Sequence, residues 1–130
     1  MAAAPNGHLV LIVEDNEKNM KLARDVLQYH GFATVEATTG EDGITLARER
    51  RPAVILMDIQ LPGIDGVTAL ERIRQNAETS RIPIVAMTAS VMKEDRERFD
   101  KAGFDGFITK PIDVKKFPDQ IRDILKKGSP

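Results

Sequence analysis

Five short apolar runs alternate with five longer amphipathic segments along the chain, and this alternation limits the possible folds more than any other feature. We expect strands at 8–14, 32–37, 53–58, 82–88 and 104–109, and helices at 16–29, 40–50, 65–75, 91–102 and 115–127. Strands that are joined by helices must run parallel, with right-handed crossovers. At 130 residues the chain has the size of one domain. The sequence therefore predicts a single βα sandwich of the α/β class.

The expected helices show apolar stripes and recognisable ends. Two stripes that would face a sheet are Met20, Ala23 and Leu27 in the first helix and Val67, Leu70 and Ile73 in the third. Gly31 suits a left-handed residue beyond the first helix, and Asp113 suits a cap for the last one. Pro118 has no amide donor, so the last helix either begins late, at about Phe117, or has a distorted first turn.

Composition and charge exclude several classes of protein. Hydrophobic residues are 42% and charged residues 30%, as in globular chains, and no apolar run is long enough to span a membrane. Nineteen basic against twenty acidic residues produce no field that attracts nucleic acid. The N-terminal MAAAPNG lacks the basic start and apolar core of a secretory signal, and cysteine is absent. We expect a cytoplasmic protein without nucleic-acid or membrane partners.

Polar side chains stand where the expected strands end. In the stretch 54–66, VILMDIQLPGIDG, an unbroken apolar run typical of a central strand stops at Asp58. A carboxylate inside such a strand is costly, but one at its carboxyl end reaches a surface crevice, where parallel sheets bind their ligands. The ends of other strands carry Glu14, Asp15, Thr88 and Lys110. Three carboxylates, a hydroxyl and an ammonium are thus predicted at one rim of the sheet.

Four segments resemble the receiver domain of two-component response regulators, and are most similar to single-domain regulators of the DivK type. They are LIVEDN at 11–16, ILMDIQLPGIDG at 55–66, IVAMTA at 84–89 and FITKPI at 107–112. The resemblance implies the flavodoxin-like, CheY-like fold, whose five parallel strands have the order 2-1-3-4-5. We expect a receiver domain at 8–127, an N-terminal extension at 1–7 and a short tail at 128–130.

The resemblance also implies roles for the acidic residues. Asp58 would be the phosphoacceptor, since a carboxylate can carry a phosphoryl group as an acyl phosphate. Glu14, Asp15 and Asp58, with the backbone carbonyl of Gln60, would hold Mg²⁺, which offsets the negative charge of both the site and the phosphoryl group. Clustering should raise the pKa of at least one of these carboxylates when no metal is bound.

Thr88 and Lys110 would contact the phosphoryl group in the same family. Lys110 is expected two strands from Asp58, a gap on the order of 10 Å that only a long cationic side chain bridges. The resemblance further suggests a cis peptide between Lys110 and Pro111. Phe107 is either an ordinary core residue or, with Thr88, part of a switch in which an aromatic side chain changes exposure on activation.

The function implied by the resemblance is that of a signalling phosphoacceptor. A sensor histidine kinase or a histidine phosphotransfer protein would donate the phosphoryl group, and an effector protein would bind the surface of helix four, strand five and helix five. The chain would be no enzyme beyond its own phosphorylation and dephosphorylation. With Met1 at the start and few residues after the last helix, we expect a stand-alone regulator; the receiver domain of a hybrid histidine kinase is the alternative.

Four other interpretations are weaker. A magnesium-dependent phosphatase of the haloacid-dehalogenase type also uses an aspartate nucleophile, but on its first strand and with an acid two residues later, where this chain has Gln60. A flavin carrier needs aromatic stacking, whereas Trp is absent and Tyr29 is the single Tyr. No GxxxxGK[ST] or GxGxxG motif for nucleotides occurs, and Gly63 and Gly66 suit turns. The intact acidic set argues against a pseudo-receiver.

Overall fold

The computed structural model describes residues 8–90 and 92–128, and in this part of the chain strands and helices alternate as predicted. The predicted extension 1–7 and the tail residues 129–130 lie outside it. The elements are β1 (Leu9–Val13), α1 (Glu17–Tyr29), β2 (Ala33–Ala37), α2 (Gly40–Arg50), β3 (Val54–Asp58), α3 (Gly66–Gln75), β4 (Ile84–Thr88), α4 (Lys93–Ala102), β5 (Gly106–Thr109) and α5 (Phe117–Gly128). The strands form one parallel sheet of order β2-β1-β3-β4-β5, which confirms the predicted fold.

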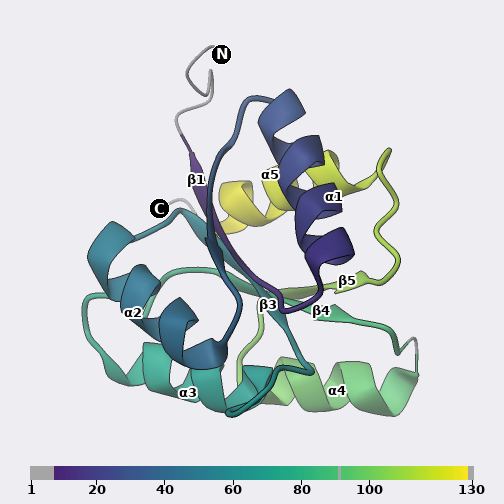
Figure 1. Ribbon diagram of the computed structural model, residues 1–130. Helices are drawn as coiled ribbons and strands as arrows, with labels where there is room; N and C mark the ends of the chain where they lie inside the picture. Colours follow the sequence, from purple (N-terminus) through teal and green to yellow (C-terminus); the bar gives the residue numbers. More distant parts are fainter. Residues whose placement is uncertain (1–7, 91, 129–130) are drawn as a thin grey trace.

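Helices cover both faces of the sheet, with α1 and α5 on one side and α2, α3 and α4 on the other (Figure 1). Successive strand residues point to opposite faces, so each central strand contributes to two cores. In β3, Val54 and Leu56 pack on the α1 and α5 side, while Ile55 and Met57 pack on the other. Burial on both faces explains why this strand is apolar without alternation.

The helix stripes and ends agree with the sequence in part. Met20, Ala23 and Leu27 of α1 are buried, and Gly31 has the expected positive φ of 90°. The last helix begins at Phe117, the later of the two alternatives, and not at 115. Pro118 is thereby its second residue, at a position where an amide donor has no partner within the helix.

The prediction that Asp113 caps the first turn of α5 is wrong. Asp113 instead caps the turn that precedes this helix. Its carboxylate accepts a hydrogen bond from the amide of Lys115 at 3.0 Å, and its carbonyl accepts one from the amide of Phe117 at 2.9 Å. Helix α4 also begins later than predicted: Met92 is its N-cap residue, and the expected start at 91 falls outside the described residues. Within residues 8–90 and 92–128, no helix is both long and apolar enough to cross a membrane.

Candidate functional site

The register of the parallel sheet brings the polar strand ends together. Val13 lies opposite Met57 on the neighbouring strand, so the residues that follow, Glu14 and Asp58, are neighbours at the carboxyl end of the sheet. On the other side of β3, Asp58 lies opposite Met87, which precedes Thr88. The predicted residues of β1, β3 and β4 therefore meet at one rim, because Glu14 directly follows β1 while Asp58 and Thr88 are the last residues of β3 and β4.

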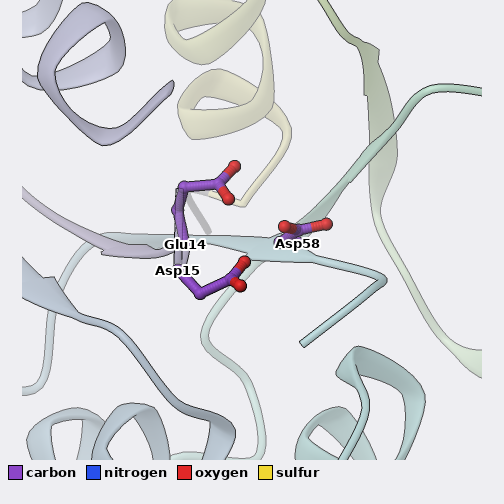
Figure 2. A group of neighbouring side chains, drawn as sticks. All are labelled: Glu14, Asp15 and Asp58. Atoms are coloured by element: carbon purple, nitrogen blue, oxygen red, sulfur yellow. The ribbon is translucent and has the colours of Figure 1, made fainter. Parts of the chain in front are cut away.

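Three carboxylates form an acidic cluster at this rim (Figure 2). Each of Glu14, Asp15 and Asp58 offers an oxygen, and these oxygens lie within 4.8 Å of one another. Glu14 is 1% exposed and Asp58 3% exposed, whereas Asp15 is exposed. Two buried carboxylates side by side are unfavourable unless positive charge balances them. The donor set consists entirely of oxygen, which suits a hard divalent cation such as Mg²⁺.

Lys110 provides the one cation that contacts this cluster in the described part of the chain. It follows β5, two strands from Asp58, and its extended side chain crosses to the acids. Its Nζ lies 3.0 Å from Glu14 Oε1 and 3.0 Å from Asp58 Oδ2. The peptide bond between Lys110 and Pro111 is cis, as the resemblance suggested. The long cationic side chain thus bridges the gap in the predicted way.

Burial and close charges shift two pKa values at the site. Burial raises the pKa of the Glu14 carboxyl above its usual 4.5, and the adjacent Asp58 raises it further, against the opposing effects of the Asn16 amide and Lys110. Burial alone would lower the pKa of the Lys110 ammonium, but its hydrogen bonds to Asp58 and Glu14 outweigh that effect and raise it above 10.5. The pKa of Glu14 thus moves in the direction expected for a clustered carboxylate, with burial as the larger cause and the neighbouring Asp58 as the smaller one.

The backbone after β3 holds Asp58 in place. The amide of Gln60 donates to Asp58 Oδ1 at 3.0 Å, and the amide of Gly66 donates to the Ile59 carbonyl at 3.1 Å. A Cβ atom at Gly66 would lie 2.4 Å from the Asp58 carbonyl oxygen, closer than such contacts allow. The prediction that Gly66 is a turn residue is therefore wrong. Gly66 is the first residue of α3, and only glycine allows the Asp58 carbonyl oxygen to come so close to it. Gly63 is the turn glycine, with a φ of 74°.

Thr88 lies beside a cavity of about 380 Å³ that includes Asp58 and Lys110. The Thr88 side chain is buried at 7% exposure, and its hydroxyl oxygen accepts a hydrogen bond from the amide of Ser90 at 3.1 Å. The cavity is also lined by three polar residues that sequence reasoning did not select: Ser90, Asp95 and Arg98. Asp95 and Arg98 belong to a charge run whose pattern indicates only a solvated helix face, so their place at the cavity had no local signal.

Phe107 is half-buried on β5, between the core and the surface of α4. Its ring centroid lies 6.4 Å from that of Phe99, a buried residue of α4, and the Arg96 guanidinium lies 5.9 Å from the Phe107 ring. This position has features of both alternatives left open by the sequence, since one side of the ring meets the core and another meets a surface cation. The role of Phe107 as a switch stays a prediction.

Comparisons with known proteins agree with the geometry. A family model described as "Response regulator receiver domain" matches residues 10–122. The protein named "Polar-differentiation response regulator DivK" from Brucella anthropi is 44% identical over 116 residues, covering 89% of this chain and 94% of the relative. A protein of the same name from Brucella ovis is 43% identical over the same coverage.

Solved structures show the same likeness. The receiver domain of sensor histidine kinase PA1611 from Pseudomonas aeruginosa has a TM-score of 0.85 and 30% identity, covering 92% of this chain and 98% of that one. Its description includes a magnesium ion coordinated in the active site cleft. A putative response regulator from Chloroflexus aurantiacus has a TM-score of 0.87 and 28% identity, covering 92% of this chain and 98% of that chain.

Proposed function

The chain belongs to the family of response regulator receiver domains, and we propose that Asp58 is its phosphoacceptor in two-component signalling. One observation carries this proposal: the carboxylates of Glu14, Asp15 and Asp58 converge within 4.8 Å, and the Lys110 ammonium lies 3.0 Å from two of them. Such an arrangement leaves more negative than positive charge in a largely buried place. This excess of negative charge is explained if the site binds a divalent cation together with an incoming phosphoryl group.

The proposed reaction is a displacement at phosphorus. A carboxylate oxygen of Asp58 attacks the phosphorus of a phosphohistidine, the P–N bond breaks, and the imidazole nitrogen leaves with the electron pair, so that an acyl phosphate forms. The amide of Gln60 holds Asp58 Oδ1 at 3.0 Å, which fixes the carboxylate plane during attack. Lys110 is already beside Asp58 Oδ2 and can offset the charge of the phosphoryl oxygens.

Glu14, Asp15 and Asp58, together with the backbone carbonyl of Gln60, would hold Mg²⁺ in this proposal. Magnesium supplies positive charge that offsets both the acids and the transferring group when it is bound. The convergence of the three carboxylates supports this assignment. The magnesium described for the PA1611 receiver domain, which is 30% identical, adds to that support.

We further propose that phosphorylation changes contacts with partner proteins. A histidine kinase or a histidine phosphotransfer protein would be the donor, and an effector would bind the surface of α4, β5 and α5. The phosphoryl group would attract the Thr88 hydroxyl, which lies on the same cavity, and the end of β4 would then change the space open to Phe107. Thr88→Ala should still accept phosphate but lose most of the phosphorylation-dependent gain in effector affinity. An unchanged gain would refute this relay.

The phosphoacceptor assignment can be tested with a small acyl phosphate or a phosphohistidine protein as the donor. Wild type should gain one phosphoryl group in the presence of Mg²⁺, seen by intact-protein mass spectrometry, and should lose the gain when the metal is chelated. Asp58→Asn should gain none. Asp100→Asn, the same chemical change at an exposed position on α4, should behave like wild type. Phosphorylation of Asp58→Asn at the wild-type level would overturn the proposal.

A further inference from the structure

The cavity lined by Asp58 also reaches α4. Its volume is about 380 Å³, and two residues of α4, Asp95 and Arg98, line it together with Ser90 from the segment between β4 and α4. The Debye length is about 8 Å at physiological ionic strength, so charges that line one cavity of this size act on one another. The lining of the cavity therefore carries one anion and one cation in addition to Asp58 and Lys110.

These two charges are held very differently. Ser90 Oγ donates to Asp95 Oδ2 at 2.5 Å and accepts from the amide of Met92 at 3.2 Å, so Asp95 is anchored to the segment between β4 and α4. The nearest Arg98 nitrogen lies 3.4 Å from Asp95 Oδ1, and the Arg98 side chain is 66% exposed. Its guanidinium lies 5.0 Å from the ring of Phe99. Asp95 is thus fixed, while Arg98 is a loosely paired, largely exposed cation that lines the cavity.

A loose pair of this kind is easily exchanged. An exposed ion pair three residues apart on a helix contributes little, typically less than about 1 kcal/mol, and Ser90 still satisfies Asp95 if Arg98 leaves. Phosphorylation would change the charge on Asp58 from one negative to about two and add oxygens that accept hydrogen bonds. A guanidinium can form two parallel hydrogen bonds with phosphoryl oxygens. These two bonds stabilise Arg98 more than its weak ion pair with Asp95 does.

We infer that Arg98 is a further phosphoryl-binding residue: its guanidinium leaves Asp95 and pairs with the phosphoryl oxygens once Asp58 is modified. Asp95 stays bound to Ser90 and opposes the incoming negative charge, so the two residues act in opposite directions on the same group. This inference rests on the proposed function, because it requires the phosphoryl group to be on Asp58. The ordinary alternative is a surface pair that stabilises α4 and takes no part in phosphoryl binding.

Binding of trifluoroberyllate, which attaches to an aspartate oxygen and has the shape and charge of a phosphoryl group, distinguishes these two roles. Its affinity would be measured by titration calorimetry with saturating Mg²⁺ and excess fluoride. Arg98→Gln should weaken binding roughly two- to fivefold, and Asp95→Asn, which keeps an oxygen for Ser90, should strengthen it by a similar factor. Arg98→Lys should fall between wild type and Arg98→Gln, because it keeps the charge but not the two-bond geometry.

Lys101→Gln is the matched control, since Lys101 is exposed on the same helix and lies outside the cavity lining. It should bind trifluoroberyllate like wild type, and the deficit of Arg98→Gln should shrink in about 1 M salt, where the Debye length is about 3 Å. Equal affinities of Arg98→Gln and Lys101→Gln, with both variants folded by their thermal unfolding, would overturn the inference. Binding by Asp58→Asn as tight as by wild type would instead overturn the proposed function.

Discussion

Two charged clusters lie at opposite ends of β4 and β5, one balanced and the other not. At the amino end, Arg74 of α3 pairs with Asp105, which precedes β5. The Arg74 guanidinium donates to four acceptors: the carbonyl oxygens of Ser80 at 3.1 Å, Ile82 at 2.5 Å and Gly103 at 3.2 Å, and the Asp105 carboxylate at 2.9 Å. The same carboxylate accepts from the amide of Ile84 at 2.8 Å. One cation here meets one anion. The remaining hydrogen bonds connect three parts of the chain: helix α3, residues 80–84 and residues 103–105.

At the carboxyl end, the single ammonium of Lys110 faces Glu14 and Asp58, with Asp15 close to both. Folding alone does not favour this excess of buried negative charge. The two clusters therefore differ in charge: Arg74 joins parts of the fold as one of a balanced pair, while the Lys110 cluster keeps an excess of negative charge that a bound cation would offset. The two clusters should therefore respond in opposite ways to substitution and to cations.

The largest effect is expected for the balanced cluster. Arg74→Ala should lower the free energy of unfolding by about 2–3 kcal/mol, because three carbonyls and Asp105 lose a charged donor. Urea unfolding measures this loss. Arg72→Ala, at an exposed position on the same helix, should change the stability by less than about 0.5 kcal/mol. Equal losses in the two variants would remove the structural role assigned to Arg74.

The second expected effect is stabilisation of the unbalanced cluster by magnesium. At a Mg²⁺ concentration ten times its Kd, the free energy of unfolding should rise by about 1.4 kcal/mol, since the metal binds the folded site. Arg74→Ala should show the same gain as wild type, because its substitution lies at the other end of the sheet. Asp15→Asn should lose most of the gain, and Asp100→Asn should retain it.

Urea unfolding at several Mg²⁺ concentrations, with Ca²⁺ as a second cation, provides the measurement. A gain that Asp15→Asn retains in full would place the metal somewhere other than the acidic cluster. A gain missing from Arg74→Ala would mean that the two ends of the sheet are coupled, so the clusters would no longer be independent.

Much of the fold was predictable because the strands are short, most of them are apolar, and turn signals follow them. The unbroken run in β3 predicts burial on both faces, and residues 54–58 are all buried. Strand order did not follow from this pattern, because spacing along the chain does not determine which parallel strands are neighbours; it came from the family resemblance. Helix starts were less predictable: α4 and α5 begin two residues later than expected, where loop contacts decide which amides find partners.

The polar rim was also predictable, since parallel strands end at the same edge and Glu14, Asp58 and Thr88 each stand at the end of one. The balanced cluster was not, because Arg74 and Asp105 are 31 residues apart and neither belongs to a motif. The place of Arg98 at the cavity was not predictable either, because its surroundings in the sequence indicate a solvated helix. Contacts that tertiary packing makes between distant segments produce no periodic pattern or fixed spacing in the sequence.

The smallest expected effect concerns Glu14 and pH. Burial, together with the nearby Asp58, raises the folded-state pKa of Glu14 above its usual 4.5. Between 4.5 and that raised pKa, the folded protein binds more protons than the unfolded chain, so stability falls as the pH rises through this window. Glu14→Gln has no carboxyl there to titrate. We therefore expect its free energy of unfolding to fall less than that of wild type as the pH is raised from 4.5 toward neutrality.

Urea unfolding in the presence of a chelator, from about pH 4.5 to about pH 7.5, tests this difference without the effect of bound metal. The raised pKa of Lys110 does not interfere, because the stability linked to it is lost only above 10.5. Glu71→Gln, at an exposed position on α3, makes the same change in net charge and shows how much of the effect is general. If the free energies of unfolding of Glu14→Gln and Glu71→Gln depend on pH in the same way, the Glu14 carboxyl has no special effect on stability. Lys110 would then already balance the charge of the buried acids. The contrast between the two clusters would then disappear.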